Sequence, residues 1–257
     1  MRTTVVTGAA SGIGKALTEL LRSRGERVIG VDLHDTDVVA DLSTAAGRAA
    51  LVDGVSTAAG GPVDAIVANA GLAHTTPATI AVNFFGATAT LEGLRPLLAG
   101  SPAPRAAFTC SMASLMPFDG ELVELCLAFD EPAALARAGK LVEEGKGDLI
   151  YASSKVALAR WLRRNAVKPE WAGAGIPLNA IGPGIVLTPM TADMTATEEA
   201  RAAISQQVPM PLNGYMTPDV PAKLFAWLVS EENSHLCGQV IFVDGGSDVV
   251  IRGDSVW

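Results

Sequence analysis

The chain has 257 residues, a hydrophobic content of 49% and a formal net charge of −8 at pH 7. An acidic chain is a poor ligand for nucleic acid or for an anionic membrane, and no apolar run approaches the length of a membrane span. The hydrophobic content is typical of a parallel sheet buried on both faces, and α/β proteins of this length are routinely one domain. We therefore expect a single domain over residues 1–257.

Three cysteines, Cys110, Cys126 and Cys237, are widely spaced and show no metal-ligand pattern. The histidines also have no carboxylate or cysteine at ligand spacing, so we predict no metal site. The cysteines are typical of small core residues in a reducing compartment. Because the chain begins almost directly with a predicted strand, there is no room for a signal peptide, and we expect a cytoplasmic protein.

The first predicted strand, residues 3–6, is followed by a glycine-rich turn and then by a helical pattern. The turn has the spacing Gly-x-x-x-Gly-x-Gly and places five residues at the start of the helix: Gly8, Ser11, Gly12, Ile13 and Gly14. Free backbone N–H groups and the positive end of the helix dipole attract a diphosphate there, and glycine lets it approach closely. Because any tight strand-to-helix turn favours glycine, the glycines alone leave an ordinary turn equally open.

Asp32 distinguishes these two interpretations. It ends a second buried strand, residues 27–31, and lies 18 residues after Gly14. In a βαβ dinucleotide unit, an acid about 20 residues beyond the glycines accepts the ribose hydroxyls. A carboxylate at that place also repels a 2′-phosphate, which favours NAD over NADP. Asp32 could instead be a solvated loop acid, but the order of strand, turn, helix, strand and acid favours a dinucleotide site.

The remaining patterns predict further strands and helices. Strands are expected at 64–68, 105–110, 176–181 and 239–243, and helices at 43–57 with Ser43 as N-cap, 77–98, 121–126, 132–144 with Pro132 at its first position, 151–171 and 219–230. Residues 189–213 are loop-like and rich in proline and methionine, and form the expected substrate loop. Together these elements predict a doubly wound Rossmann-type parallel sheet of six or seven strands with helices on both faces.

One strand assignment is left open. Residues 37–40 have the pattern of a third strand but lie very close to Asp32. Parallel neighbours need a crossover of a dozen or more residues. Either the usual crossover helix is missing here, or the segment is merely extended.

Tyr151 and Lys155 are four residues apart in a predicted helix and share one face. A phenol has an ordinary pKa near 10, so it cannot act as a base at neutral pH without help. A neighbouring ammonium group stabilises the phenolate and lowers that pKa, so Lys155 can tune Tyr151 into a general acid–base. The spacing alone favours the simpler interpretation, a tyrosine packed against a lysine side chain on an amphipathic helix.

In chain order, the glycine-rich turn, Asp32, Asn69-Ala70-Gly71, Asn83, Ser111, Tyr151-x-x-x-Lys155 and Pro183-Gly184 resemble the short-chain dehydrogenase/reductase family over nearly the whole chain. The resemblance implies a catalytic tetrad of Asn83, Ser111, Tyr151 and Lys155. In it, Tyr151 exchanges a proton with the substrate oxygen and Ser111 holds that oxygen. Lys155 lowers the pKa of Tyr151 and binds the nicotinamide ribose, and Asn83 holds a water that links Lys155 to solvent. Ser114 is a rival for Ser111, which we prefer because it directly ends a strand.

The resemblance also implies the residues around the cofactor. Asn69, Ala70 and Gly71 support the sheet beside it, and Asp41 and Leu42 flank the adenine. The segment 181–188 surrounds the nicotinamide amide through four residues: Pro183, Gly184, Ile185 and Thr188.

Two departures from the family pattern refine this resemblance. Ser111 and Tyr151 are 40 residues apart, where about a dozen is usual, so residues 115–149 form a helical insertion near the active site. A helix after the second strand is also missing. Both features resemble the bacterial 3α-hydroxysteroid dehydrogenase/carbonyl reductase branch. Because the insertion falls on the helix face through which many members pair, we expect a homodimer, with the usual tetramer as the alternative.

The substrate class follows from methionines near the serine and in the substrate loop. Ser111, Met112, Met116 and Met190 are the expected substrate contacts. Thioether side chains suit a broad apolar pocket, although ordinary core packing explains each of them equally well. We therefore expect an NAD(H)-dependent enzyme that interconverts a bulky hydrophobic ketone and a secondary alcohol, with steroid position 3 favoured. The alternatives are a 3-oxoacyl-thioester reductase that uses NADPH and a non-catalytic NAD-binding redox sensor.

Overall fold

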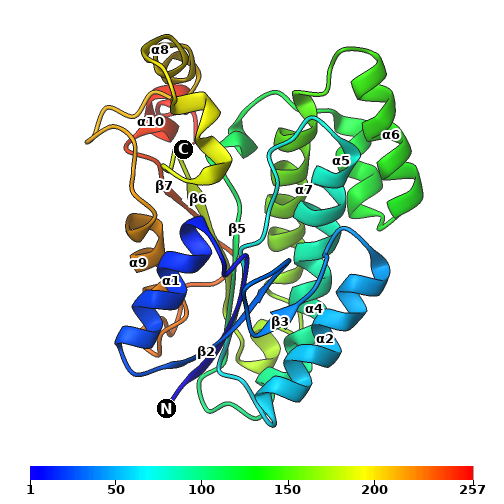
Figure 1. The fold of residues 1–257 in the computed structure, drawn as a ribbon, viewed down its shortest axis with the longest axis vertical. Helices are drawn as coiled ribbons and strands as arrows, with labels where there is room; N and C mark the ends of the chain where they lie inside the picture. The colour runs from blue at the N-terminus through cyan, green and yellow to red at the C-terminus, as the bar shows by residue number, and fades with distance from the viewer. Residues whose placement is uncertain (257) are drawn as a thin grey trace.

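The computed structural model describes residues 1–256 and contains one seven-stranded parallel sheet with the order β3-β2-β1-β4-β5-β6-β7 (Figure 1). The strands are β1 (Thr3–Thr7), β2 (Arg27–Asp32), β3 (Val38–Val39), β4 (Ala65–Ala68), β5 (Arg105–Thr109), β6 (Leu178–Pro183) and β7 (Val240–Val243). The strand order reverses between β1 and β4, and ligands bind at such a point, beyond the carboxyl ends of the strands. The predicted doubly wound Rossmann-type fold is confirmed.

Helices cover both faces of the sheet (Figure 1). On one face lie α1 (Gly12–Ser23) and α9 (Asp219–Leu228), and on the other α2 (Ala45–Ala59), α4 (Ala87–Leu98) and α7 (Leu149–Asn165). Successive strand residues point to opposite faces, so Val5 packs with Phe108 and Trp161 in one core while Val6 packs with Leu17 in the other. The apolar runs of the strands are therefore buried from both sides, as the composition predicted.

The segment after β2 is a true strand. β3 pairs in parallel with β2 through Val31–Val38 and Asp32–Val39, and the intervening residues 33–37 contain no helix. The Asp37 carboxylate accepts a hydrogen bond from the Gly30 backbone N–H at 2.8 Å, which holds this short connection against β2. Of the two alternatives left open by the sequence, the first is therefore correct: residues 37–40 contain a strand, and the usual crossover helix before it is missing.

The helix expected over 77–98 is present but is not uniform. It consists of α3 (Pro77–Ile80), a π-helical segment η1 (Ala81–Gly86) and α4. π-Helical turns are rare and are often found at functional sites. This one contains Asn83.

The two helical patterns predicted between 115 and 149 form α5 (Gly120–Leu127) and α6 (Glu131–Glu143). α5 packs against α7, and α6 packs against α3. The Arg137 guanidinium on α6 donates to both oxygens of Asp119, the N-cap of α5, and holds the pKa of that carboxyl below its usual range. This half-buried pair joins the two inserted helices.

Several predicted boundaries were wrong. The N-cap of α2 is Thr44, not Ser43, because the Thr44 hydroxyl accepts from the Gly47 N–H at 3.0 Å. Pro132 occupies the second position of α6, after Glu131. α7 begins at Leu149 and ends at Asn165, short of the predicted Trp171, and a 3-10 turn η3 (Ala172–Ala174) follows.

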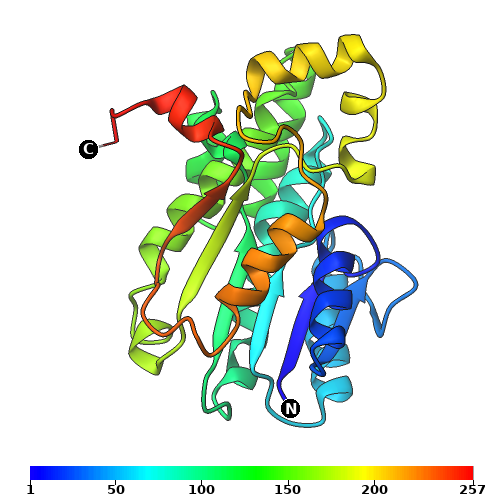
Figure 2. The same cartoon turned by 90° about the vertical axis from the view of Figure 1, so that its left-hand side faces the viewer.

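The segment predicted as the substrate loop contains helices. It holds the 3-10 turns η4 (Pro189–Thr191) and η5 (Asp193–Thr195) and the helix α8 (Glu198–Gln207). No residue of α8 is buried, so its sequence carries no apolar stripe from which a helix could be predicted. Figure 2 shows this segment arching over the end of the sheet where the strands finish.

Two further elements lie near that end of the sheet. The short turn η2 (Met112–Leu115) follows β5, and the helix α10 (Ser247–Arg252) follows β7 and packs against η2. α10 lies beyond the last strand and was not predicted. Within residues 1–256, no helix combines the length and the apolar character that a bilayer span requires.

Candidate active site

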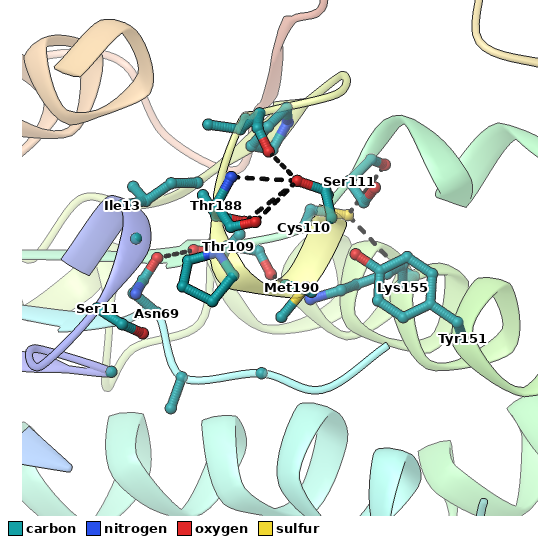
Figure 3. A pocket seen from close by; sticks show the side chains of 18 of the residues that line it. Ser11, Ile13, Asn69, Thr109, Cys110, Ser111, Tyr151, Lys155, Thr188 and Met190 are labelled. Atoms are coloured by element: carbon teal, nitrogen blue, oxygen red, sulfur yellow. Dashed lines mark hydrogen bonds between the residues drawn. The ribbon is translucent and has the colours of Figure 1, made fainter. Parts of the chain in front are cut away.

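A cleft that is partly open to solvent lies beyond the carboxyl ends of β1, β4, β5 and β6 (Figure 3). Its wall combines the glycine-rich turn, the strand ends, one face of α7 and the segment after β6. Fourteen residues expected at the site line it: Gly8, Ser11, Gly12, Ile13, Asn69, Ala70, Gly71, Ser111, Tyr151, Lys155, Pro183, Gly184, Thr188 and Met190.

The glycine-rich turn needs its glycines for conformation and for space. Gly8 and Gly12 have φ angles of +72° and +50°, in the left-handed region that side chains disfavour. A Cβ on Gly14 would lie 2.1 Å from the Gly8 carbonyl oxygen, so only glycine lets α1 start this close to β1. The turn therefore leaves the backbone N–H groups at the start of α1 facing the cleft, a suitable cradle for a diphosphate.

Asp32 lies at the outer edge of this turn. Its two carboxylate oxygens accept hydrogen bonds from the backbone N–H groups of Ala10 at 2.9 Å and Leu33 at 2.7 Å. These bonds fix the carboxylate beside the glycine-rich turn, although Asp32 itself does not line the cleft. The negative charge is thus held beside the diphosphate cradle, where an adenosine ribose would follow.

Asn69 ties together the three strands on which the cleft rests. Its backbone N–H donates to the Thr7 hydroxyl on β1 at 3.0 Å, and its side-chain N–H donates to the Thr7 carbonyl at 3.2 Å. Its side-chain oxygen accepts from the Thr109 hydroxyl on β5 at 2.9 Å. Asn69 itself follows β4. The Asn69-Ala70-Gly71 segment therefore holds the strand ends at the point where the sheet order reverses.

Three polar side chains of the expected tetrad face the cleft. Ser111 directly follows β5, whereas Tyr151 and Lys155 lie on α7 next to each other (Figure 3). The Lys155 ammonium group donates to the Thr109 carbonyl at 2.9 Å and lies 5.6 Å from the centre of the Tyr151 ring. The rival Ser114 does not line the cleft, because its hydroxyl turns back to the Ser111 carbonyl at 2.8 Å.

The burial of these groups changes their acidities. Burial raises the pKa of Tyr151, with a hydrogen bond from Ser111 acting in the opposite direction. Burial also lowers the pKa of Lys155 to about 8. Loss of hydration is thus the largest influence on the pKa of Tyr151 in the protein alone, and the lowering of that pKa by Lys155 stays a prediction.

Asn83 lies behind the cleft wall. Its side chain is fully buried and does not line the cleft. The amide donates to the Leu72 carbonyl at 2.9 Å and to the Ser154 hydroxyl at 3.0 Å, and its oxygen accepts from the Leu72 N–H at 2.8 Å. The structure thus brings three of the four expected tetrad residues into the cleft and places the fourth beneath it.

Six other expected site residues do not line the cleft. Gly14 lies in the first turn of α1, close to the Gly8 carbonyl oxygen. Asp41 is exposed and accepts a backbone hydrogen bond from Ser43, and hydrogen bonds from that residue lower its pKa. Leu42 is buried in the main core, while Met112, Ile185 and, in part, Met116 pack into a small cluster with Val208 and Met210. Of the expected substrate contacts, only Ser111 and Met190 therefore form part of the cleft wall among the described residues.

Five lining residues were not predicted as individual contacts: Thr109, Cys110, Val186, Pro189 and Thr191, of which the last three fall within the predicted 181–188 segment and substrate loop. All of them flank predicted residues. Thr188-Pro189-x-Thr191 carried a usable signal, since a threonine before a proline is typical of a helix start. In the structure, the Thr191 hydroxyl accepts from the Thr188 N–H at 3.1 Å and closes a reciprocal cap on η4.

Two family models match the chain. Residues 2–123 match the model described as short chain dehydrogenase, and residues 133–248 match the one described as enoyl-(acyl carrier protein) reductase. The residues between the two matches, 124–132, lie within the inserted helical pair.

Full-length relatives give the same family. The 3-alpha-hydroxysteroid dehydrogenase/carbonyl reductase of Comamonas testosteroni is 34% identical over 96% of this chain and 97% of its own length. The cis-4-hydroxycyclohexanecarboxylate dehydrogenase of Sinomonas cyclohexanicum is 28% identical, and the match covers 97% of each chain. A solved structure of the 3-alpha-hydroxysteroid dehydrogenase from Pseudomonas sp. B-0831 complexed with NADH superposes with a TM-score of 0.89 and 38% identity, covering 98% of this chain and 99% of that one. The chain therefore belongs to the short-chain dehydrogenase/reductase family, as a nicotinamide-dependent oxidoreductase of alcohols and carbonyl compounds close to the 3α-hydroxysteroid dehydrogenase/carbonyl reductase branch.

Proposed function

We propose that this enzyme interconverts a bulky, uncharged ring ketone and the corresponding secondary alcohol with NAD(H), with position 3 of a steroid as the favoured site. The observation that carries the proposal is the joint presence of Ser111, Tyr151 and Lys155 in a cleft that begins at the glycine-rich turn. The hydroxysteroid and hydroxycyclohexanecarboxylate in the names of two relatives support a ring substrate, although the second of these compounds carries a carboxylate.

The residues present fit a nicotinamide dinucleotide. The glycine-rich turn would hold the diphosphate, Asp32 the adenosine ribose and Lys155 the nicotinamide ribose, while Gly184 and Thr188 would border the amide. When bound, the nicotinamide ring donates a hydride to the carbonyl carbon in reduction and accepts one in oxidation. The NADH complex of the Pseudomonas relative supports NAD(H) as the cofactor.

The protein supplies the proton. In reduction, the Tyr151 hydroxyl donates it to the carbonyl oxygen while the Ser111 hydroxyl hydrogen-bonds to that oxygen. The raised pKa of Tyr151 keeps the phenol protonated at neutral pH, which suits this direction. In oxidation, the phenolate must accept the proton, and the ammonium group of Lys155 is placed to stabilise it.

The cleft wall favours a neutral substrate. Val186, Pro189 and Met190 give it an apolar side, and Lys155 is the one charged side chain among the described residues that line it. Lys155 is needed for the chemistry and is already hydrogen-bonded to Thr109. No second cation is therefore available in the wall for the phosphate of an acyl-carrier thioester.

We further propose a homodimer. α5 and α6 form an inserted layer over α7 and α3, in front of helix faces that a shorter family member would expose. Pairing through those faces, which a tetramer of the common kind needs, is thereby obstructed.

A substrate screen tests the proposed function. The purified protein is mixed with NADH or NADPH and with steroid 3-ketones, substituted cyclohexanones or a 3-oxoacyl thioester, and oxidation of the reduced cofactor is followed by absorbance. We expect turnover of the neutral ring ketones with NADH. Turnover of the thioester alone, with NADPH, would identify a fatty-acid reductase instead. Tight NADH binding without turnover of any compound would identify a sensor.

The cofactor preference depends on Asp32. Replacing it with alanine removes the carboxylate that repels a 2′-phosphate, so the ratio of kcat/KM for NADH to that for NADPH should fall at least ~10-fold, equivalent to ~1.4 kcal/mol. Asp37→Ala is the matched control, since Asp37 bonds the Gly30 N–H at the same sheet edge without reaching the glycine-rich turn. Steady-state kinetics with both cofactors measures the ratio, and the same ratio in Asp32→Ala and wild type would place the carboxylate away from the ribose.

A further inference from the structure

We propose that Ser154 is a positioning residue that couples Asn83 to the helix carrying Tyr151 and Lys155. The inference rests on the proposed function, because it assigns Ser154 a role in the same proton transfer. Ser154 and Asn83 are both 0% exposed, and the Asn83 amide donates to the Ser154 hydroxyl at 3.0 Å. The Ser154 hydroxyl in turn donates to the backbone carbonyl of Tyr151 at 2.6 Å.

These hydrogen bonds connect the cleft wall after β4 with the helix α7. Asn83 also holds both the N–H and the carbonyl of Leu72, at 2.8 and 2.9 Å, directly after Gly71 of the cleft wall. One continuous set of hydrogen bonds therefore runs from the cleft wall through Asn83 and Ser154 to the backbone of Tyr151. Both N–H groups of the Asn83 amide are used, which a buried amide requires.

The π-helical segment explains why such a tie is needed. η1 departs from regular α-helical geometry over six residues, Ala81–Gly86, and packs directly against α7. The bond from the Asn83 amide to the Ser154 hydroxyl is a direct side-chain tie between this irregular segment and α7. Without the Ser154 hydroxyl, one N–H of Asn83 loses its partner in a dry environment and the segment can shift.

A small shift of this kind affects catalysis because proton and hydride transfer depend on alignment. Tyr151 and Lys155 are carried by the same helix, and a misplacement of ~1 Å at a reacting group can cost ~100-fold in rate. We expect a smaller displacement on loss of one hydrogen bond, and hence a loss of kcat of ~10-fold.

Ser153 provides a matched control one residue away. It is also 0% exposed and lies on the same helix. Its hydroxyl donates to the Leu149 carbonyl at 2.8 Å and accepts from the Asp119 N–H at 2.9 Å, so it contacts the insertion and not Asn83. Ser153→Ala thus removes a buried hydroxyl of the same kind without touching the proposed coupling.

The experiment is a double-mutant cycle. Ser154→Ala and Ser153→Ala are each made in the wild-type and the Asn83→Ala background, and kcat for ketone reduction and the Kd for NADH are measured. We expect Ser154→Ala to lower kcat ~10-fold in the wild type and less than ~2-fold in Asn83→Ala, with NADH affinity unchanged. Ser153→Ala should change kcat by the same small factor in both backgrounds. Equal losses for Ser154→Ala in both backgrounds, or a wild-type kcat, would overturn the inference.

Two further measurements keep the test decisive. If Ser154→Ala does not fold, Ser154→Thr and Ser154→Val are compared, because they share a shape and only threonine keeps the hydroxyl; threonine alone should preserve kcat. Urea unfolding of the same variants needs no substrate. The decreases in the free energy of unfolding caused by Asn83→Ala and by Ser154→Ala should not add in the double variant. Absence of ketone turnover in the wild type refutes the proposed function alone, whereas additive unfolding losses refute the coupling alone.

Discussion

Replacing Tyr151 with phenylalanine should lower kcat/KM for ketone reduction by ~10³-fold, which corresponds to ~4 kcal/mol of transition-state stabilisation. Phenylalanine keeps the ring, including its contact with the Lys155 ammonium group 5.6 Å from the ring centre, and removes only the hydroxyl that donates the proton. General acid catalysis typically contributes ~10²- to 10⁴-fold. The variant should therefore fold and bind cofactor but transfer hydride slowly.

Three measurements check this expectation. Titration with NADH should give a Kd within ~2-fold of the wild type, because the hydroxyl is not part of the diphosphate cradle. Tyr215→Phe is the control, since Tyr215 is the other tyrosine of the chain and its hydroxyl bonds Ser205 and the Arg201 carbonyl on α8. It should keep kcat within ~3-fold. Undiminished turnover by Tyr151→Phe would refute the role of Tyr151 as proton donor.

The pH dependence of ketone reduction tests the role of Tyr151 independently. Reduction needs the protonated phenol, so the wild-type rate should fall as pH rises through the pKa of Tyr151. Because burial raises that pKa, the fall should come at an alkaline pH and not near neutrality. The residual rate of Tyr151→Phe should not show this fall. A wild-type rate that already falls near pH 7 would indicate that the phenol is not the group that titrates.

The overall sheet could be predicted from sequence because parallel strands buried on both faces are continuous apolar runs. β4 is such a run, whereas β1 and β5 carry threonine or arginine beside their apolar residues; each of the three is followed by a polar or glycine-containing turn. The strand ends also carry the cleft residues, so the glycine-rich turn, Asn69 and Ser111 could be found from their positions after strands. β3 could be suspected but not assigned, because a strand of two residues is too short to show a hydrophobic pattern.

Features decided by tertiary packing could not be predicted. The apolar pattern of 77–98 is compatible with a regular helix, and nothing in it marks the π-helical turn at Asn83. Apolar side chains also do not reveal whether they line a cleft or a core, so Leu42 and Met112 were placed at the site although both are buried elsewhere. The burial that raises the pKa of Tyr151 could not be predicted either, because the degree of burial is a property of the fold and not of the Tyr-x-x-x-Lys spacing.

Lys155→Met should make the protein more stable and less active. Burial lowers the pKa of Lys155 from 10.5 to about 8, so keeping its ammonium charged in the folded state costs roughly 3 kcal/mol at neutral pH. Methionine fills a similar volume without charge. Loss of the hydrogen bond to the Thr109 carbonyl lowers the free energy of unfolding by ~1 kcal/mol. The net increase in the free energy of unfolding is then ~2 kcal/mol, and Tm should rise by ~5 °C. Turnover should fall ~10³-fold or more, because Lys155 supports both the phenolate and the nicotinamide ribose.

The pH dependence of this gain follows from where each state loses its proton. Between pH 8 and 10.5 the folded wild type has released the Lys155 proton while the unfolded chain still binds it, so wild-type stability rises with pH over that interval. The advantage of Lys155→Met should therefore be largest below pH 8 and disappear by about pH 10.5. Thermal unfolding over this range measures it, with Lys223→Met, at an exposed Asp219 pair, as a control expected to shift Tm by less than ~2 °C. A Lys155→Met protein less stable than the wild type at pH 7 would mean that the ammonium group is held by favourable contacts that outweigh its loss of hydration. The surroundings of Lys155 would then stabilise a charged lysine. A variant more stable than the wild type would show that this position lowers stability while it supports catalysis.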